Sequence, residues 1–78
     1  MLTIDAEKII MDFGGVKKVT RALKEVGHPR TAHAVRNWVR RNNIPIDGVI
    51  TLAYIARSNN QRFDLLDYVA TEEKDNDT

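Results

Sequence analysis

Apolar residues recur every three or four positions along most of the chain, which is the spacing of one face of an α-helix. The first such stretch, residues 3–13, ends at a pair of glycines, and the second, residues 16–26, ends at Gly27. Glycine adopts the backbone geometry that ends helices, and Pro29 cannot continue one. We therefore predict two short helices, followed by a turn over residues 27–30.

A third stretch, residues 31–42, has two unlike faces. Thr31 is placed to cap its first turn, because a threonine side chain accepts a hydrogen bond from the start of a helix. One face is apolar and contains Ala34, Val35, Trp38 and Val39. The other is polar or cationic and contains His33, Arg36, Asn37, Arg40 and Arg41. The register of Trp38 with the apolar face favours a position in the core over stacking on a base.

The rest of the chain predicts one more helix and an ambiguous segment. Asparagines and Pro45 interrupt the pattern, and a helix over residues 46–57 follows. Its inward candidates are Val49, Ile50, Leu52, Ala53 and Ala56. Residues 63–69 fit either a short helix or a strand, and we favour a short helix. Residues 71–78 contain four acids and no large apolar residue, so they are predicted to be a disordered acidic tail.

The length and composition indicate one small all-α domain of four or five short helices, over residues 1–70. The chain has 78 residues, of which 42% are hydrophobic, and this is enough for a core. It has no cysteine, which excludes disulfides and thiolate zinc sites. The longest apolar run, residues 49–56, is too short to span a membrane, and the first residues lack a signal-peptide pattern. We expect a soluble cytoplasmic protein that has no membrane partner.

The formal net charge of +1 conceals a segregation of charges along the chain. Residues 14–42 carry a net charge of +7, because eight Lys and Arg residues stand against Glu25. The flanking segments are acidic or neutral, with −2 over residues 1–13, zero over residues 43–60 and −4 over residues 61–78. A concentrated basic region is typical of proteins that bind polyanions, and the acidic remainder limits indiscriminate binding.

Three motifs follow one another in a characteristic order. They read Phe13-Gly14-Gly15-Val16-Lys17-Lys18-Val19-Thr20-Arg21-Ala22-Leu23, then Ala34-Val35-Arg36-Asn37-Trp38, then Ile44-Pro45. This order resembles the Cro and lambda-repressor-like helix-turn-helix regulators of phages, over residues 5–57. The resemblance implies that the helix over residues 31–42 enters the major groove of DNA. The twelve-residue step from Leu23 to Val35 is longer than in the family, and we expect a longer second helix and a larger loop.

The resemblance also implies which residues contact DNA. The base-reading positions fall on Ala32, His33, Arg36 and Asn37. The residue types favour the same assignment, since arginine forks onto guanine, asparagine pairs with adenine and alanine touches the thymine methyl group. The residues predicted to bind phosphates are Lys17, Lys18, Arg21, Thr31, Arg40 and Arg41.

More apolar surface is present than four short helices need to cover a core. The helix over residues 46–57 is apolar on more than one face, through Ile46, Ile50, Tyr54 and Ile55. The candidates for a dimer interface are Tyr54, Ile55, Phe63, Leu66 and Val69. We therefore expect a homodimer on a pseudo-palindromic operator, formed either in solution or only on DNA.

These features together predict a sequence-specific transcriptional regulator, a Cro-like repressor, whose partner is double-stranded DNA. The alternatives are a DNA-binding accessory module of a recombinase or transposase, and an antirepressor-like protein-interaction domain. An enzyme is not expected, because no nucleophile, base and orienting group suggest themselves. His28 and His33 make no convincing metal pair, and neither a cofactor nor a small-molecule substrate is expected.

Overall fold

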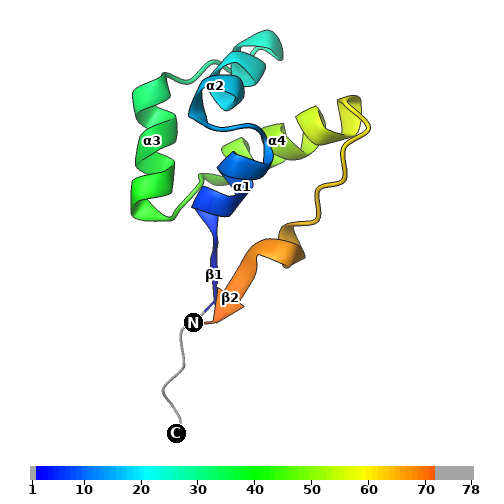
Figure 1. The fold of residues 1–78 in the computed structure, drawn as a ribbon. Coiled ribbons are helices and arrows are strands. Elements are labelled where there is room, and N and C mark those ends of the chain that lie inside the picture. The colour runs from blue at the N-terminus through cyan, green and yellow to red at the C-terminus, as the bar shows by residue number, and fades with distance from the viewer. Residues whose placement is uncertain (1, 72–78) are drawn as a thin grey trace, which may run out of the picture.

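The computed structural model describes residues 2–71, with side chains over residues 3–69. In chain order its elements are β1 (Leu2–Ile4), α1 (Ala6–Asp12), α2 (Val16–Glu25), α3 (Ala32–Arg41), α4 (Ile46–Ser58), a 3₁₀ helix η1 (Leu65–Tyr68) and β2 (Val69–Thr71) (Figure 1). The protein is small and mostly helical, as predicted, and the number of helices is confirmed. No helix of the described part is long and apolar enough to cross a membrane.

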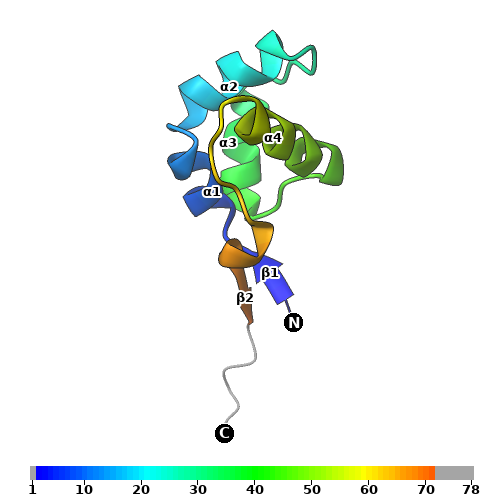
Figure 2. The same cartoon turned by 90° about the vertical axis from the view of Figure 1, so that its right-hand side faces the viewer.

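A two-stranded antiparallel sheet, which we did not predict, joins the two ends of the described chain. Thr3 was expected to start the first helix, but it lies in β1 opposite Ala70, and Ile4 lies opposite Val69. The ribbon projects from the helical part, at the end away from α2 (Figures 1 and 2). Each strand is three residues long and pairs with a segment distant in sequence, so local periodicity gave no signal for it.

The C-terminal segment contains both structures that residues 63–69 allowed. A 3₁₀ helix is followed directly by a strand, so the expected short helix covers only part of the segment. The predicted disordered tail, residues 71–78, lies outside the described residues except for Thr71, the last residue of β2.

All four α-helices end in the same type of turn. The residue that turns the chain has a positive φ in each case: Gly14 (104°), Gly27 (87°), Asn42 (52°) and Asn60 (59°). The following N–H donates to the carbonyl oxygen five residues earlier, at donor–acceptor distances of 2.8–3.0 Å. Glycine and asparagine adopt this left-handed conformation most easily, which is why the sequence indicated the helix ends so well.

The core lies where the four α-helices meet. Its buried residues are Ala6, Ile9, Ile10, Val19, Leu23, Val35, Trp38, Ile44, Leu52 and Ile55. The core position predicted for Trp38 is confirmed, with 8% of the residue exposed. Gly48 makes room for it, because an added Cβ would lie 3.2 Å from the indole Cη2 and 3.0 Å from Cγ2 of Ile44.

The inward face of α4 differs from the one predicted. Ile50 and Ala53 are exposed, whereas Thr51 and Ile55 are buried. The Thr51 hydroxyl donates to the carbonyl oxygen of Asp47 at 2.7 Å, which satisfies a polar group inside the core. Because α4 is apolar on most sides, its spacing alone could not select the face that packs on the other helices.

The segment after α4 is joined to α1 by hydrogen bonds. The backbone N–H of Asp5 donates to the carbonyl oxygen of Tyr68 at 2.8 Å, and the Tyr68 hydroxyl donates to Oδ2 of Asp12 at 2.7 Å. Burial, together with the nearby Asp12 carboxylate, raises the pKa of Tyr68 to about 12. The same hydrogen bond, assisted by Lys8, lowers the pKa of Asp12. Phe63 packs edge-on against Phe13, with ring centroids 5.5 Å apart.

Asn42 links the end of α3 to the start of α1. Its side-chain oxygen Oδ1 accepts a hydrogen bond at 2.9 Å from the backbone N–H of Ala6, a fully buried residue. The only other non-glycine residue with a positive φ in the described chain, Asn60, ends α4 without a recorded side-chain hydrogen bond. The two asparagines therefore share a backbone conformation and differ in this one interaction.

We predict that Asn42→Gly lowers the free energy of unfolding by about 1–2 kcal/mol, because it keeps the left-handed turn but leaves the Ala6 N–H without its acceptor. Asn60→Gly is the matched control, and its effect should stay within about 0.5 kcal/mol. Urea unfolding followed by circular dichroism measures both values. Equal stability of the two variants would contradict a role for the Asn42 hydrogen bond.

Candidate nucleic-acid interface

Helix α3 has the two faces that its sequence predicts. The Thr31 hydroxyl oxygen accepts from the backbone N–H of Ala34 at 3.0 Å, so the predicted cap is confirmed. Val35 and Trp38 are buried on the inner face. Of the four predicted base-reading residues, His33 and Arg36 are exposed on the outer face, and Ala32 and Asn37 are half-buried. In Figure 1, α3 stands at one side of the molecule, and its outer face is not covered by another described element.

Two residues of the outer face of α3 bind each other. Nη2 of Arg40 donates to Oδ1 of Asn37 at 2.7 Å. This interaction occupies the amide oxygen of Asn37 and leaves its NH₂ group as a donor. Bidentate pairing with adenine needs both groups of the amide, so the predicted contact of Asn37 with a base would require Arg40 to release the oxygen. The bond is exposed to solvent, so its loss costs only about 0.5–1.5 kcal/mol.

The predicted phosphate-binding residues of α2 lie on two sides of that helix, because Lys17 and Arg21 line a groove with Ala32 of α3, whereas Lys18 lines a hollow with Phe13 and Ile55. Lys17, Lys18 and Arg21 are exposed on α2, and Arg40 and Arg41 are exposed at the end of α3. Within residues 2–71 none of these five cations forms an ion pair. Among the described residues, these cations are therefore positive charges without an ion-paired partner. An arrangement of this kind attracts a polyanion over distances of about the Debye length, roughly 10 Å at 0.1 M salt.

The long step from Leu23 to Val35 runs through the end of α2, the connection between α2 and α3, and the start of α3. Helix α2 ends at Glu25, two residues beyond Leu23. The connection covers residues 26–31. It is held by the turn at Gly27 and by an ion pair between Arg30 and Asp47, with Nη2 and Oδ2 2.6 Å apart.

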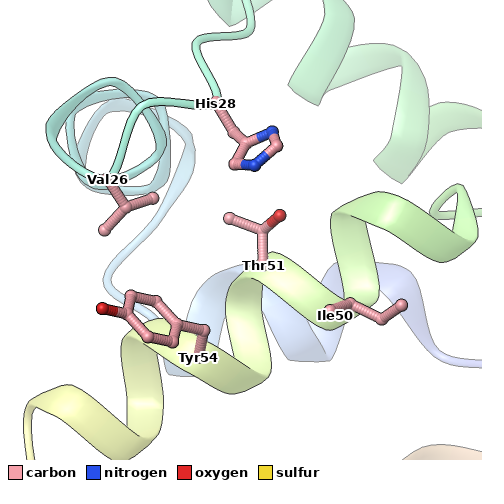
Figure 3. Close-up of a pocket in the computed structure, with 5 residues that line it drawn as sticks. All are labelled: Val26, His28, Ile50, Thr51 and Tyr54. Atoms are coloured by element: carbon pink, nitrogen blue, oxygen red, sulfur yellow. The ribbon is translucent and has the colours of Figure 1, made fainter.

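The two histidines lie in different surroundings. His33 is on the exposed face of α3, and His28 lies in the connection and points toward Thr51 of α4 (Figure 3). The described residues contain no group of three or more metal-ligating side chains that could hold a metal ion. Neither histidine is therefore part of a recognisable metal cluster in this part of the chain.

The residues proposed for a dimer interface differ in exposure and fall into three groups. Tyr54 and Leu66 are strongly exposed, at 58% and 77%, whereas Phe63 and Val69 are half-buried. Ile55 was a wrong choice, because it is only 4% exposed and packs in the core. It follows Tyr54 directly, and adjacent residues on a helix point in different directions.

An exposed apolar stripe runs along α4. It consists of Ile46, Ile50 and Tyr54, which recur every four residues and are 58–74% exposed. A hollow of about 330 Å³ lies beside the stripe, lined by Val26, His28, Ile50, Thr51 and Tyr54 (Figure 3). The Tyr54 ring lies on α4 across from Val26, at the end of α2. A stripe of large apolar residues next to a hollow is typical of a surface that another molecule covers.

Comparison of the chain with protein-family models, with curated proteins and with solved structures gives no match. The function therefore has to be argued from the residues and their arrangement.

Proposed function

We propose that the protein is a sequence-specific DNA-binding regulator of transcription that inserts α3 into the major groove of an operator. The observation that carries this proposal is the outer face of α3, where Arg36, Asn37 and His33 stand on a helix whose opposite face is buried. An α-helix fits the width of the major groove, and these side chains match the donors and acceptors of base edges. A buried inner face holds the helix rigidly, so its readers are positioned before DNA binds.

The arrangement of the helices supports a helix-turn-helix of the lambda-repressor-like type. Helices α2 and α3 pack on each other and on α1, and they are joined directly by the connection over residues 26–31. Lys17, Arg21 and Lys24 of α2 line a groove together with Ala32 at the start of α3. In this arrangement α2 crosses the phosphate backbone while α3 reads bases.

Different residues make the base contacts and the phosphate contacts. Arg36 donates to O6 and N7 of guanine, Asn37 pairs with adenine, Ala32 touches a thymine methyl group, and His33 offers a further polar contact. The phosphate contacts come from Lys17, Lys18, Arg21, Arg40 and Arg41. Thr31 contributes as well, because its hydroxyl accepts the capping bond and still has a proton to donate to a phosphate oxygen. Occupation of the operator then blocks polymerase or a competing activator, which makes the protein a repressor.

A homodimer explains how so small a domain selects its site. A single helix addresses only a few base pairs, and paired half-sites multiply the discrimination. The stripe of Ile46, Ile50 and Tyr54 is the surface best suited to a two-fold contact, because it is apolar, exposed and adjacent to a hollow. Leu66 adds a further exposed apolar residue after α4.

The first prediction concerns duplex DNA and salt. If two subunits engage about three to five phosphates each, affinity falls by about three to five decades between 50 and 200 mM salt. Fluorescence anisotropy of a labelled duplex across this range measures the slope. A flat response, or no binding at low salt, would refute DNA binding and favour the protein-interaction alternative.

The second prediction separates readers from clamps. Arg36→Ala should weaken binding to a selected operator by about 1–3 kcal/mol and relax the preference for its base, because a bidentate contact is lost. Arg41→Ala is the matched control, since it removes the same charge from the same helix but should weaken specific and random duplexes alike. Binding to libraries of operator variants measures both effects. Unchanged base preference in the Arg36 variant would show that α3 is not the reading helix.

The third prediction concerns the dimer. Tyr54→Glu should abolish cooperative binding to paired half-sites about 34 Å apart while the fold is retained, because Tyr54 is exposed and its charge would be buried in the contact. Met11→Glu changes another strongly exposed apolar residue, on α1, and should leave cooperativity intact. Sedimentation with and without operator measures the stoichiometry. One subunit saturating an operator that lacks an inverted repeat would exclude the dimer.

A further inference from the structure

A groove of about 360 Å³ lies between α2 and the start of α3. Four of the residues that line it are cationic: Lys17, Arg21, Lys24 and Arg30. Thr20, Pro29 and Ala32 are also part of the lining. No carboxylate lines the groove, although Glu25 follows Lys24 in the sequence, because Glu25 lines a separate hollow. The charged residues of its lining are therefore all cationic, and of these Arg30 is paired with Asp47 outside the lining.

The cations of the groove come from two segments that the fold brings together. Lys17, Arg21 and Lys24 are spaced by four and three residues, so they share one face of α2. Like charges at these spacings destabilise a helix, so helix stability does not account for them. Within the described chain none of the three forms an ion pair. Their common environment is the groove, which suggests that a ligand compensates their charge.

Arg30 is held at the groove by its neighbours. Its Nη2 lies 2.6 Å from Oδ2 of Asp47, and its Nη1 donates to the carbonyl oxygen of Pro29 at 3.0 Å. A guanidinium has five N–H donors, so donors are left over for a ligand. The side chain is 37% exposed and thus accessible. The ion pair with Asp47 therefore leaves donors of Arg30 free for a ligand.

We propose that this groove binds a backbone phosphate of duplex DNA, with Lys24 and Arg30 as contacts additional to those of Lys17 and Arg21. A phosphodiester has one negative charge and two non-bridging oxygens, which guanidinium and ammonium donors bind well. Lys24 lies in the last turn of α2 and Arg30 in the connection that follows, so the end of α2 and the connection together build this contact. The inference rests on the proposed function, because the groove lies beside the start of the helix proposed to read bases.

The test compares salt slopes for a duplex of random sequence. Lys24→Gln/Arg30→Gln should make the negative slope of log affinity against log salt less steep by about two. The loss of affinity of this double variant between 50 and 200 mM salt should then be about tenfold smaller than that of the unaltered protein. Arg57→Gln/Arg62→Gln removes the same net charge from residues that do not line the groove, and it should keep the full slope. Lys24→Gln alone should give about half the effect without disturbing any described ion pair.

Asp47→Asn provides a second control, because it breaks the ion pair of Arg30 while leaving all four cations in place. It should keep the full slope. If it reproduced the loss seen in the double variant, Arg30 would act only by holding the connection, and the phosphate site would be refuted.

If the double variant and the Arg57/Arg62 control had equal slopes, the groove would be refuted as a phosphate site while DNA binding stood. No salt-dependent binding by the unaltered protein would overturn both.

A nuclear magnetic resonance titration distinguishes DNA from a free anion. Duplex DNA should shift the backbone signals of Lys24 and Ala32, and inorganic phosphate at the same ionic strength should not. Equal shifts with both ligands would make the groove a site for small anions and overturn its assignment to the DNA backbone.

Discussion

The burial of Val35 and Trp38 is the constraint on which the rest of the structure depends. These two side chains fix the rotation of α3 about its own axis, and thereby direct His33, Arg36 and Arg40 outward. The absence of a side chain at Gly48 permits the close approach of the indole to α4. Because an α-helix turns by about 100° per residue, a change in this packing would rotate every polar residue of α3 away from its place.

The ends of α3 are fixed by interactions of a different kind. Thr31 caps its first turn, and Asn42 ends it in a left-handed turn while accepting a hydrogen bond from the start of α1. The ion pair of Arg30 with Asp47 joins the connection before α3 to the first turn of α4. A helix held at both ends and along one face would move little on binding DNA, so little ordering entropy would oppose the proposed contact.

The charged side chains of α2 and α3 lie where they do not disturb the packing of the apolar core. The cations of α2 and α3 lie on outer faces, where solvent screens their mutual repulsion, and the core contains one polar residue, Thr51. The acidic groups that the structure pairs, Asp12, Asp47, Asp64 and Asp67, lie outside the α2–α3 unit. This segregation leaves the proposed DNA-facing surface positive in a protein with a net charge of only +1.

The sequence alone determined the four α-helices, the turns that terminate them and the two faces of α3, because 3.6-residue periodicity, glycine and asparagine turns and the Thr31 cap act over a few residues. Tertiary structure decided the rest. The pairing of β1 with β2 joins opposite ends of the described chain, and the choice of Ile55 over Ile50 for the core depends on which side of α4 meets the other helices. The groove that unites Lys24 with Arg30 arises only when the connection folds back beside α2. Such contacts depend on where distant segments meet, which no local pattern of residues encodes.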